Sequence, residues 1–556
     1  MSDKAQQEHH EREGFFRAAK LTAAVTLLSR LFGMVRDMAI ASLGATTETS
    51  VFVAAYRIPN LFRRLFGEGA LSGAFVPVFT ETAEREGQES ANRLFANAHG
   101  LLAAFLTGVM LVIQLALVAW WWLQASHAQA NGTPPWPWDR QLLVMLTVVM
   151  LPFMPAICVL ALGSAALNCR GHFAFPSFAP IILNIVIILG AWVAAPLLFS
   201  DVIGQLYVIA GSVTVAGIAQ YLVMLRVLRA MGLPLRPTLT PVQPGIRAML
   251  VLMAPTVLGL SFPQLASLFE VVVIRWFSAT DQQTTTTLLG HTLDLPLHKG
   301  AQVYVYCASQ LYQFPMGVLA ISLSVAVFPL LSRYAGRGDM ANFRDSLNRA
   351  IRLSLVEGLA AGVGLFVLVE PITALIYQRR RFTAHDVQET AGVLMVYLVG
   401  MWAYCTYQIM VRAFYAIKEP RRPLKVIAVM AVAAMVMDLT LIWIPGMGAK
   451  AFGAATALSM SLTVAVLAVM LRRRLGRLGG RAIMLSAVRS LAACAVMAGV
   501  ILALRWWLGP RPAWLVVLVC VPVGGLAFML TAWLLRAPEL REFLAGRREV
   551  AQPSRP

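Results

Sequence analysis

The sequence predicts an all-α, polytopic membrane protein, and three observations support this fold class. Of the 556 residues, 58% are hydrophobic and only 13% are charged, whereas about a quarter of the residues in soluble domains are charged. The mean hydropathy is +0.70. Apolar stretches of roughly 20 to 30 residues recur along the chain, and each is long enough as a helix to cross a hydrocarbon core of about 30 Å. Because little sequence remains for a domain outside the bilayer, a soluble enzyme is excluded.

The apolar stretches predict about fourteen transmembrane helices, arranged as two six-helix lobes and a C-terminal helix pair. The expected helices cover residues 15–43, 49–82, 92–124, 140–168, 174–199, 203–231, 245–278, 301–334, 343–377, 384–417, 422–444, 450–475, 483–508 and 513–536. The longer outer segments, 125–139 and 279–299, are expected to be surface loops or short outer helices.

A proline-rich stretch, LPLRPTLTPVQPG, cannot continue a helix and indicates a linker between the lobes. The expected parts are a cytoplasmic tail (1–14), the N-lobe (15–232), the linker (233–244), the C-lobe (245–475), the helix pair (483–536) and a second cytoplasmic tail (537–556).

A weak internal repeat supports this division. When Pro77 is laid on Pro329, Ala74 falls on Ala326 and Arg85 falls on Arg337. Six helices per unit keep the same orientation in the membrane, so the lobes are expected to be parallel repeats, a common arrangement in transporters.

The formal charge of +19 is distributed as a topology signal rather than as a nucleic-acid-binding patch. If the first helix starts inside, the inner segments collect roughly four times as many Lys and Arg residues as the outer segments, as the positive-inside rule expects. Both termini are therefore expected in the cytoplasm, and no nucleic acid partner is expected. The run from Arg379 to Arg381 is an exception, because it falls on the outer side. The six cysteines show no metal-ligand spacing, so no cofactor is expected from them.

The first two expected helices carry charges inside their apolar length. These residues are Arg30, Arg36, Asp37, Arg57, Arg63, Arg64 and Glu68. At a rise of about 1.5 Å per residue, Arg36 and Arg57 reach about the same depth, and Arg30 roughly matches Arg63 and Arg64. An arginine in hydrocarbon costs a few kcal/mol or more, so this set requires a water-filled cavity between the lobes or a bound anion.

Two interpretations of these charges are open. Guanidinium groups bind phosphate oxygens in a bidentate manner and stay charged at physiological pH, which favours a phosphate-binding site. Alternatively, Arg64 and Glu68 form a structural pair at i and i+4, and the other side chains reach the membrane interface.

Four segments together resemble the MurJ/MviN family, the lipid II flippases of bacterial peptidoglycan synthesis, which belong to the multidrug/oligosaccharidyl-lipid/polysaccharide exporter superfamily. The segments are SRLFGMVRD (29–37), AYRIPNLFRRLFGEGALSGAFVPVF (55–79), IYQRRRFTAHDVQETAGVL (376–394) and RAFYAIKEPRRPLK (412–425). The resemblance covers essentially the whole chain, including the helix count.

This resemblance implies that Arg30, Arg36, Asp37 and Arg63 are important for transport. It also implies a central cationic cavity for lipid II, the lipid-linked diphosphate disaccharide-pentapeptide, and a groove for the polyprenyl tail on the last two helices. The implied location is the bacterial cytoplasmic membrane, with membrane lipids and cell-wall synthesis proteins as further partners.

Four residues at three places depart from the family pattern. Ser50 stands where the family commonly has Asp, and Glu48 is a substitute two residues away. Gln310 stands where an arginine is usual, next to Ser309, which replaces a polar or acidic residue. Arg380 replaces a usual glycine.

A cation site is also implied. Glu270 resembles an acid that binds sodium in some family members, and Asp438 and Thr456 are the candidates for its partners. The alternative for Asp438 is a structural hydrogen bond to a neighbouring helix.

The function predicted from the sequence is translocation of lipid II by alternating access, without covalent chemistry. The alternatives are an exporter of another polyprenyl-diphosphate-linked saccharide, a cation-coupled drug exporter, a polyprenyl-phosphate glycosyltransferase, and a structural partner in cell-wall synthesis. A drug exporter is disfavoured because the arginines repel a cation. A glycosyltransferase would need an acidic, metal-binding loop or a sizeable outer domain, and the sequence has neither.

Overall fold

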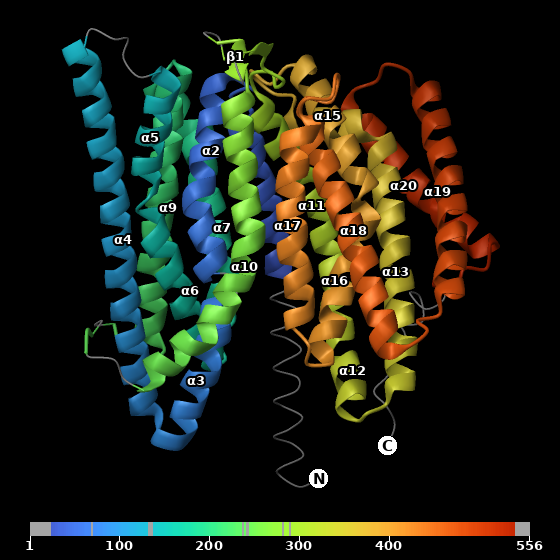
Figure 1. Cartoon of the computed structure of the whole chain (residues 1–556), viewed down its shortest axis with the longest axis horizontal. Helices are drawn as coiled ribbons and strands as arrows, with labels where there is room; N and C mark the ends of the chain where they lie inside the picture. The colour runs from blue at the N-terminus through green and yellow to red at the C-terminus, as the bar shows by residue number, and fades with distance from the viewer. Residues whose placement is uncertain are drawn as a thin grey trace. The chain divides into compact units, whose positions relative to one another are not determined.

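The computed structural model describes residues 24–67, 70–131, 137–235, 238–240, 244–280, 283–288 and 291–539. The chain forms two compact units, Met1–Val271 and Val272–Pro556, and Figure 1 shows each as a bundle of helices.

The boundary between the units lies inside helix α10 (Pro244–Phe277) rather than at the proline-rich linker. Residues 238–240 of the linker are held against the first unit, because the amide of Thr238 donates to the carbonyl of Ala96 and the amide of Thr240 donates to Asn97 Oδ1. A Cβ atom added to Gly245, at the start of α10, would lie 2.8 Å from Leu94. The first part of α10 therefore packs with the first unit.

The first unit consists of helices. Residues 24–41 are helical and are followed by α2 (Thr47–Phe62), the π-helical turn η1 (Arg63–Gly67), α3 (Ala70–Glu86), α4 (Gln88–Asn131), α5 (Trp138–Met150), α6 (Phe153–Cys169), α7 (Ala174–Leu189), the π-helical turn η2 (Gly190–Ala194), α8 (Ala195–Leu198), α9 (Val202–Ala230) and most of α10.

The second unit begins near the end of α10. It contains strands β1 (Thr285–Leu288) and β2 (His291–Asp294), then α11 (Ala301–Val318), α12 (Ala320–Gly336), α13 (Met340–Val367), α14 (Val369–Tyr377), α15 (Ala384–Val399), α16 (Met401–Ala416), α17 (Arg421–Leu441), α18 (Lys450–Leu475), α19 (Gly480–Leu508) and α20 (Ala513–Leu534).

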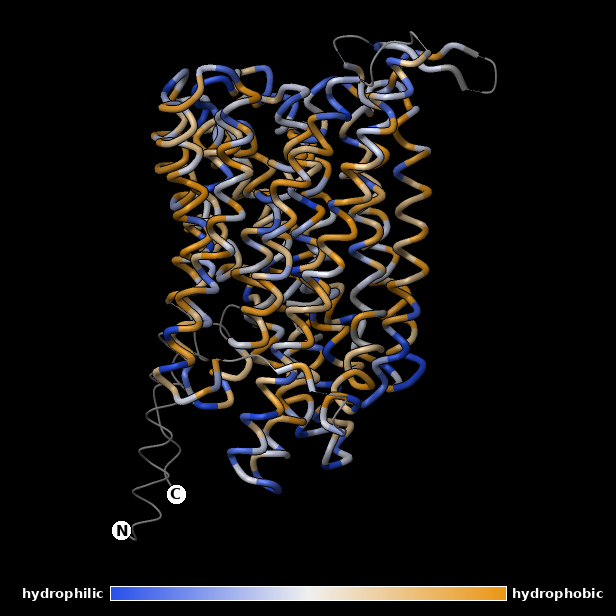
Figure 2. Tube along the Cα trace, turned by 90° about the vertical axis from the view of Figure 1, so that its left-hand side faces the viewer, coloured by the Kyte–Doolittle hydropathy of each residue, from blue (hydrophilic) through white to orange (hydrophobic). Residues whose placement is uncertain are grey.

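The all-α membrane fold predicted from the sequence is confirmed. Within the described residues, each expected helical range coincides with a helix or a series of helices. Within the described residues, nine helices are long and apolar enough to cross a membrane, or up to 11 if each of two bent pairs is one span. The first helix and α2, which carry the intramembrane charges, are not among the nine. Figure 2 shows hydrophobic residues along the middle of the helices and hydrophilic residues at their ends.

Close helix contacts in each unit depend on glycine. In the first unit, α6 packs on α9, and a Cβ atom at Gly217 would lie 2.8 Å from the Phe153 ring. In the second unit, a Cβ atom at Gly358 on α13 would lie 2.8 Å from Trp402 Cα on α16. A larger residue at either position would push the helices apart, because small residues at helix–helix interfaces let the two backbones approach closely.

The segment 279–299 contains an antiparallel pair of strands, which the sequence analysis did not predict. Thr285 pairs with Asp294, and Leu288 pairs with His291. The threonine run supplies β-branched side chains that favour strands over helix, which explains why this segment is not a short helix.

Candidate functional site

Helix α2 changes its geometry at Arg63. It starts at the N-cap Thr46, whose hydroxyl accepts from the amide of Thr49. Pro59 lies inside the helix and removes one backbone donor. The π-helical turn Arg63–Gly67 follows directly, and such turns re-aim side chains relative to a regular helix. A regular i, i+4 spacing therefore does not describe the helix at Arg63 and Arg64.

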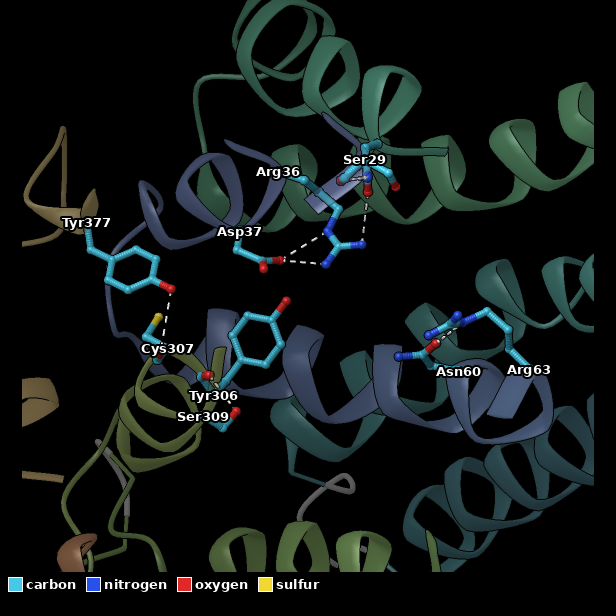
Figure 3. Close-up of polar contacts among 10 residues, drawn as sticks. Ser29, Arg36, Asp37, Asn60, Arg63, Tyr306, Cys307, Ser309 and Tyr377 are labelled. Atoms are coloured by element: carbon cyan, nitrogen blue, oxygen red, sulfur yellow. Dashed lines mark hydrogen bonds and ion pairs between the residues drawn. The ribbon is translucent and has the colours of Figure 1, made fainter. Parts of the chain in front are cut away.

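Arg36 is the centre of a network that joins the first helix to α7 (Figure 3). Its Nε and Nη2 atoms both donate to Asp37 Oδ1, at 3.0 and 2.8 Å. Its Nη1 atom donates to Asn184 Oδ1 on α7 at 3.1 Å, and the Asn184 amide donates to the carbonyl of Ser29 at 3.1 Å. The Arg36 side chain is 14% exposed and the Asp37 side chain is 4% exposed. The guanidinium group is therefore held in place while part of it stays accessible.

Arg36 also lies beside α2. Its guanidinium carbon is 6.0 Å from the centroid of the Tyr56 ring, within the range of a cation–π interaction. This contact puts Arg36 at the level of Tyr56 and its neighbour Arg57, in agreement with the shared depth expected from the helix rise.

Arg57 joins α2 to α10. Its Nη1 atom donates to the hydroxyl of Ser267 at 2.9 Å and to the carbonyl of Ser267 at 3.4 Å. Its Nη2 atom lies 3.5 Å from Glu270 Oε1, and the two side chains are 16% and 17% exposed. Glu270 is therefore a counter-ion for Arg57 in this structure.

The remaining charged candidates of the first unit differ in their contacts. Arg63 donates through Nε to Asn60 Oδ1 at 2.6 Å (Figure 3). Arg30 is partly exposed and makes no hydrogen bond or ion pair within the described ranges. Arg64 is partly exposed in η1. Glu68 lies outside the described residues, so its pairing with Arg64 stays a prediction.

Gln310 lies on α11 in the second unit. The hydroxyl of its neighbour Ser309 donates to the carbonyl of Tyr306 at 2.7 Å. Two residues after Gln310, the Tyr312 ring stacks with those of Tyr397 and Tyr404, with ring centroids 4.8 and 5.0 Å away. This part of the second unit offers polar and aromatic groups where the resemblance implies a cation.

Ser50, another departure from the expected family pattern, is buried on α2, and its hydroxyl has no hydrogen-bond partner within the described part of the chain. Glu48 lies in the first turn of the same helix, where the positive end of the helix dipole stabilises a negative charge. A neutral buried group thus stands where the resemblance implies an acid.

The three candidate sodium ligands belong to different units. Glu270 lies in the first unit, whereas Asp438 on α17 and Thr456 on α18 lie in the second, where these two helices pack together. Asp438 is buried, and the Thr456 hydroxyl donates to the carbonyl of Phe452 at 2.7 Å. Within the described ranges, no three or more His, Cys, Asp or Glu residues form a group that could hold a metal ion. The sodium site stays a prediction.

Sequence reasoning missed three partners of the arginines, namely Asn184, Asn60 and Ser267. Asn184 is a lone amide in the apolar run IILNIVIIL, and a polar residue in such a run indicates a functional or structural contact. Ser267 and Glu270 are three residues apart and share one face of α10. Both signals are visible in the sequence, but neither identifies its partner on another helix.

Solved structures show the class of fold. The chain resembles a structure of the lipid II flippase MurJ in an inward closed conformation, with a TM-score of 0.70 and 21% identity, covering 92% of this chain and 98% of that chain. It also resembles an inward-facing multidrug resistance transporter of the MATE family in the MOP superfamily, with a TM-score of 0.62 and 13% identity, covering 83% and 98% of the two chains. The chain is thus a multi-pass membrane protein with the fold of this transporter superfamily.

The sequence comparisons identify the family within this class. The family model for the lipid II flippase MurJ matches residues 40–517. A probable lipid II flippase MurJ of Vibrio cholerae serotype O1 is 30% identical over 455 residues, which cover 80% of this chain and 81% of the relative. This chain belongs to the lipid II flippase MurJ family.

Proposed function

We propose that this protein moves lipid II from the inner to the outer leaflet of the bacterial cytoplasmic membrane by alternating access. The family match over residues 40–517 is the observation that carries this proposal. The arginines of the first unit supply the chemistry, because lipid II contains a diphosphate that guanidinium groups bind well.

The head group is the part of the substrate that the protein must handle. Phosphate oxygens accept charge-assisted hydrogen bonds worth about 1.5 to 3 kcal/mol each. Arg36 is held by Asp37 and Asn184, so it loses little side-chain freedom when it binds an anion. Arg30, which has no ion pair within the described residues, adds a further cation on the same helix.

The tail of the substrate needs no polar site. Helices α19 and α20 pack together and against α13 and α14, and they expose apolar side chains such as Leu502, Leu526 and Leu530. These residues offer an apolar surface for the polyprenyl chain while the head group crosses the membrane. No bond is made or broken in this process.

The distribution of positive charge sets the proposed orientation. The turns at Lys418–Lys425 and Arg472–Arg481 face the cytoplasm, together with both termini, as the positive-inside rule expects. A sodium ion bound by Glu270, Asp438 and Thr456 is the proposed coupling ion, and cell-wall synthesis proteins are the proposed partners in the membrane.

Rescue of a flippase-depleted bacterium with this gene tests the function. We expect growth to be restored, with lipid II reaching the outer leaflet. If an exporter of another lipid-linked saccharide is the correct function, the cells would make the protein at normal levels and still die with lipid II in the inner leaflet.

A further inference from the structure

The contacts of Arg57 connect two helices at positions away from their ends. Arg57 lies ten residues after the start of α2, and Glu270 lies seven residues before the end of α10, which puts both about 10 to 15 Å from these helix ends. Ion pairs at such depth are expensive to form and are usually functional. We therefore expect the Arg57–Glu270 pair to have a function in addition to connecting the two helices.

Arg36 and Arg57 differ in the position of the carboxylate that pairs with each of them. Arg36 gives two hydrogen bonds to Asp37, its neighbour in the chain, so this pair stays together whatever the helices do. Arg57 has its counter-ion on another helix, at the longer distance of 3.5 Å. An incoming anion can therefore compete for Arg57 more easily than for Arg36.

We propose that Glu270 is a displaceable counter-ion, which positions Arg57 on α10 in the absence of substrate and gives it up to the substrate diphosphate. This inference rests on the proposed function. Ser267 assists, because its hydroxyl holds Nη1 at 2.9 Å while Nη2 makes the weaker contact to Glu270. Arg57 Nη2, which faces Glu270 in this structure, then donates its hydrogen bond to a phosphate oxygen instead.

Displacement has two physical consequences. It removes the ion pair that joins α2 to α10, so anion binding is coupled to the position of α10. It also leaves the Glu270 carboxylate without its cation, which opposes anion binding. By reciprocity, any change that neutralises Glu270 strengthens diphosphate binding, provided that Arg57 is present.

A double-mutant cycle tests this proposal. Purified full-length protein is titrated with undecaprenyl diphosphate in detergent, and the dissociation constant is measured for the original chain, Glu270→Gln, Arg57→Ala and the double variant. Glu270→Gln should bind about three- to tenfold more tightly, since it removes the competition of a partly buried ion pair. Arg57→Ala should bind more weakly, and Glu270→Gln should give no gain in the Arg57→Ala background.

A second ion pair provides the matched control. Arg505 Nη2 lies 3.6 Å from Glu370 Oε2 in the second unit, a separation close to that of Arg57 and Glu270. Glu370→Gln should leave the dissociation constant unchanged. If Glu270→Gln does not fold, Glu270→Asp replaces it, because the shorter side chain keeps the charge and draws it away from Arg57; its affinity gain should be smaller but in the same direction.

The outcomes separate this inference from the proposed function. If the original chain does not bind the lipid diphosphate, the proposed function fails, and this inference fails with it. If the original chain binds but Glu270→Gln and Glu270→Asp bind no more tightly, only the counter-ion role is wrong. An equal gain with and without Arg57 would also overturn it, since Glu270 would then act as a distant repulsive charge.

Discussion

At the scale of single residues, the hydrogen-bond partners of an arginine determine how firmly its guanidinium group is positioned. Asp37 and Asn184 satisfy three nitrogens of Arg36, and its guanidinium plane is therefore fixed before a ligand arrives. A planar, fixed fork is the arrangement that binds phosphate oxygens pairwise. Arg380 has a left-handed φ of 50°, a backbone conformation that is uncommon for residues other than glycine.

Replacement of Arg36 tests the phosphate site. Arg36→Ala should abolish rescue of flippase-depleted cells at normal protein levels, because loss of a charge-assisted contact costs about 1.5 to 3 kcal/mol, or roughly ten- to a hundredfold in affinity. Arg36→Lys should rescue only partly, because lysine lacks the bidentate fork. Growth and protein level are measured together. Normal growth of Arg36→Ala would mean that Arg36 is a structural residue.

Asn184 makes a more selective test of the same network. Asn184→Leu removes the acceptor of Arg36 Nη1 but leaves the charge and the Asp37 pair intact. We expect affinity for undecaprenyl diphosphate to fall by about fivefold, since one hydrogen bond contributes about 1 kcal/mol. Gln114→Leu is the control, since Gln114 also makes an interhelical hydrogen bond, to the carbonyl of Val148. Equal effects of the two changes would indicate general destabilisation.

The predicted sodium site is tested by neutral amides. Glu270→Gln and Asp438→Asn should each abolish sodium-dependent thermal stabilisation of the purified protein, because carboxylates supply the hard oxygen ligands and the charge. Potassium at the same ionic strength controls for general salt effects. Sodium stabilisation that persists in both variants would assign these acids purely structural roles.

At the scale of elements, the sequence predicts where the helices lie but not how they bend or pair. The length of each apolar run is set by the thickness of the bilayer, so the expected ranges coincide with helices. The π-helical turn at Arg63–Gly67 and the 45° bend between α15 and α16 depend on local packing, which a hydropathy pattern does not record. The Arg57–Glu270 pair joins residues 213 apart in sequence, so only the fold can reveal it.

Helix α13 anchors the end of the second unit. Arg352 Nη1 lies 2.8 Å from Glu539 Oε1, and these side chains are 12% and 2% exposed. Removing one partner of a buried pair leaves an uncompensated charge, which costs about 3 to 5 kcal/mol. Arg352→Met should therefore lower the thermal unfolding midpoint markedly. Arg422→Met, which removes an exposed partner of Glu419, should change it little, and equal shifts would contradict the burial argument.

At the scale of the whole molecule, the proposed direction of transport depends on the orientation of the chain in the membrane. Helices α15 and α16, bent by 45° relative to each other, are together long and apolar enough to cross the membrane, and Arg381 precedes this pair while Arg422 follows it. In intact cells, an impermeant thiol reagent should label Arg381→Cys and spare Arg422→Cys, because charge bias puts the second residue inside. The unchanged chain, whose six cysteines are buried or partly buried, provides the background. The reverse pattern would invert the topology.

The most direct test of the central claim is the position of lipid II in cells that depend on this protein. Lipid II in spheroplasts of a flippase-depleted strain is exposed to an impermeant reagent that modifies only the outer leaflet. With this chain, the modified fraction should rise to that of undepleted cells, and with Arg36→Ala it should stay at the depleted level. Lipid II that remains inaccessible despite normal amounts of the unaltered protein would contradict the account.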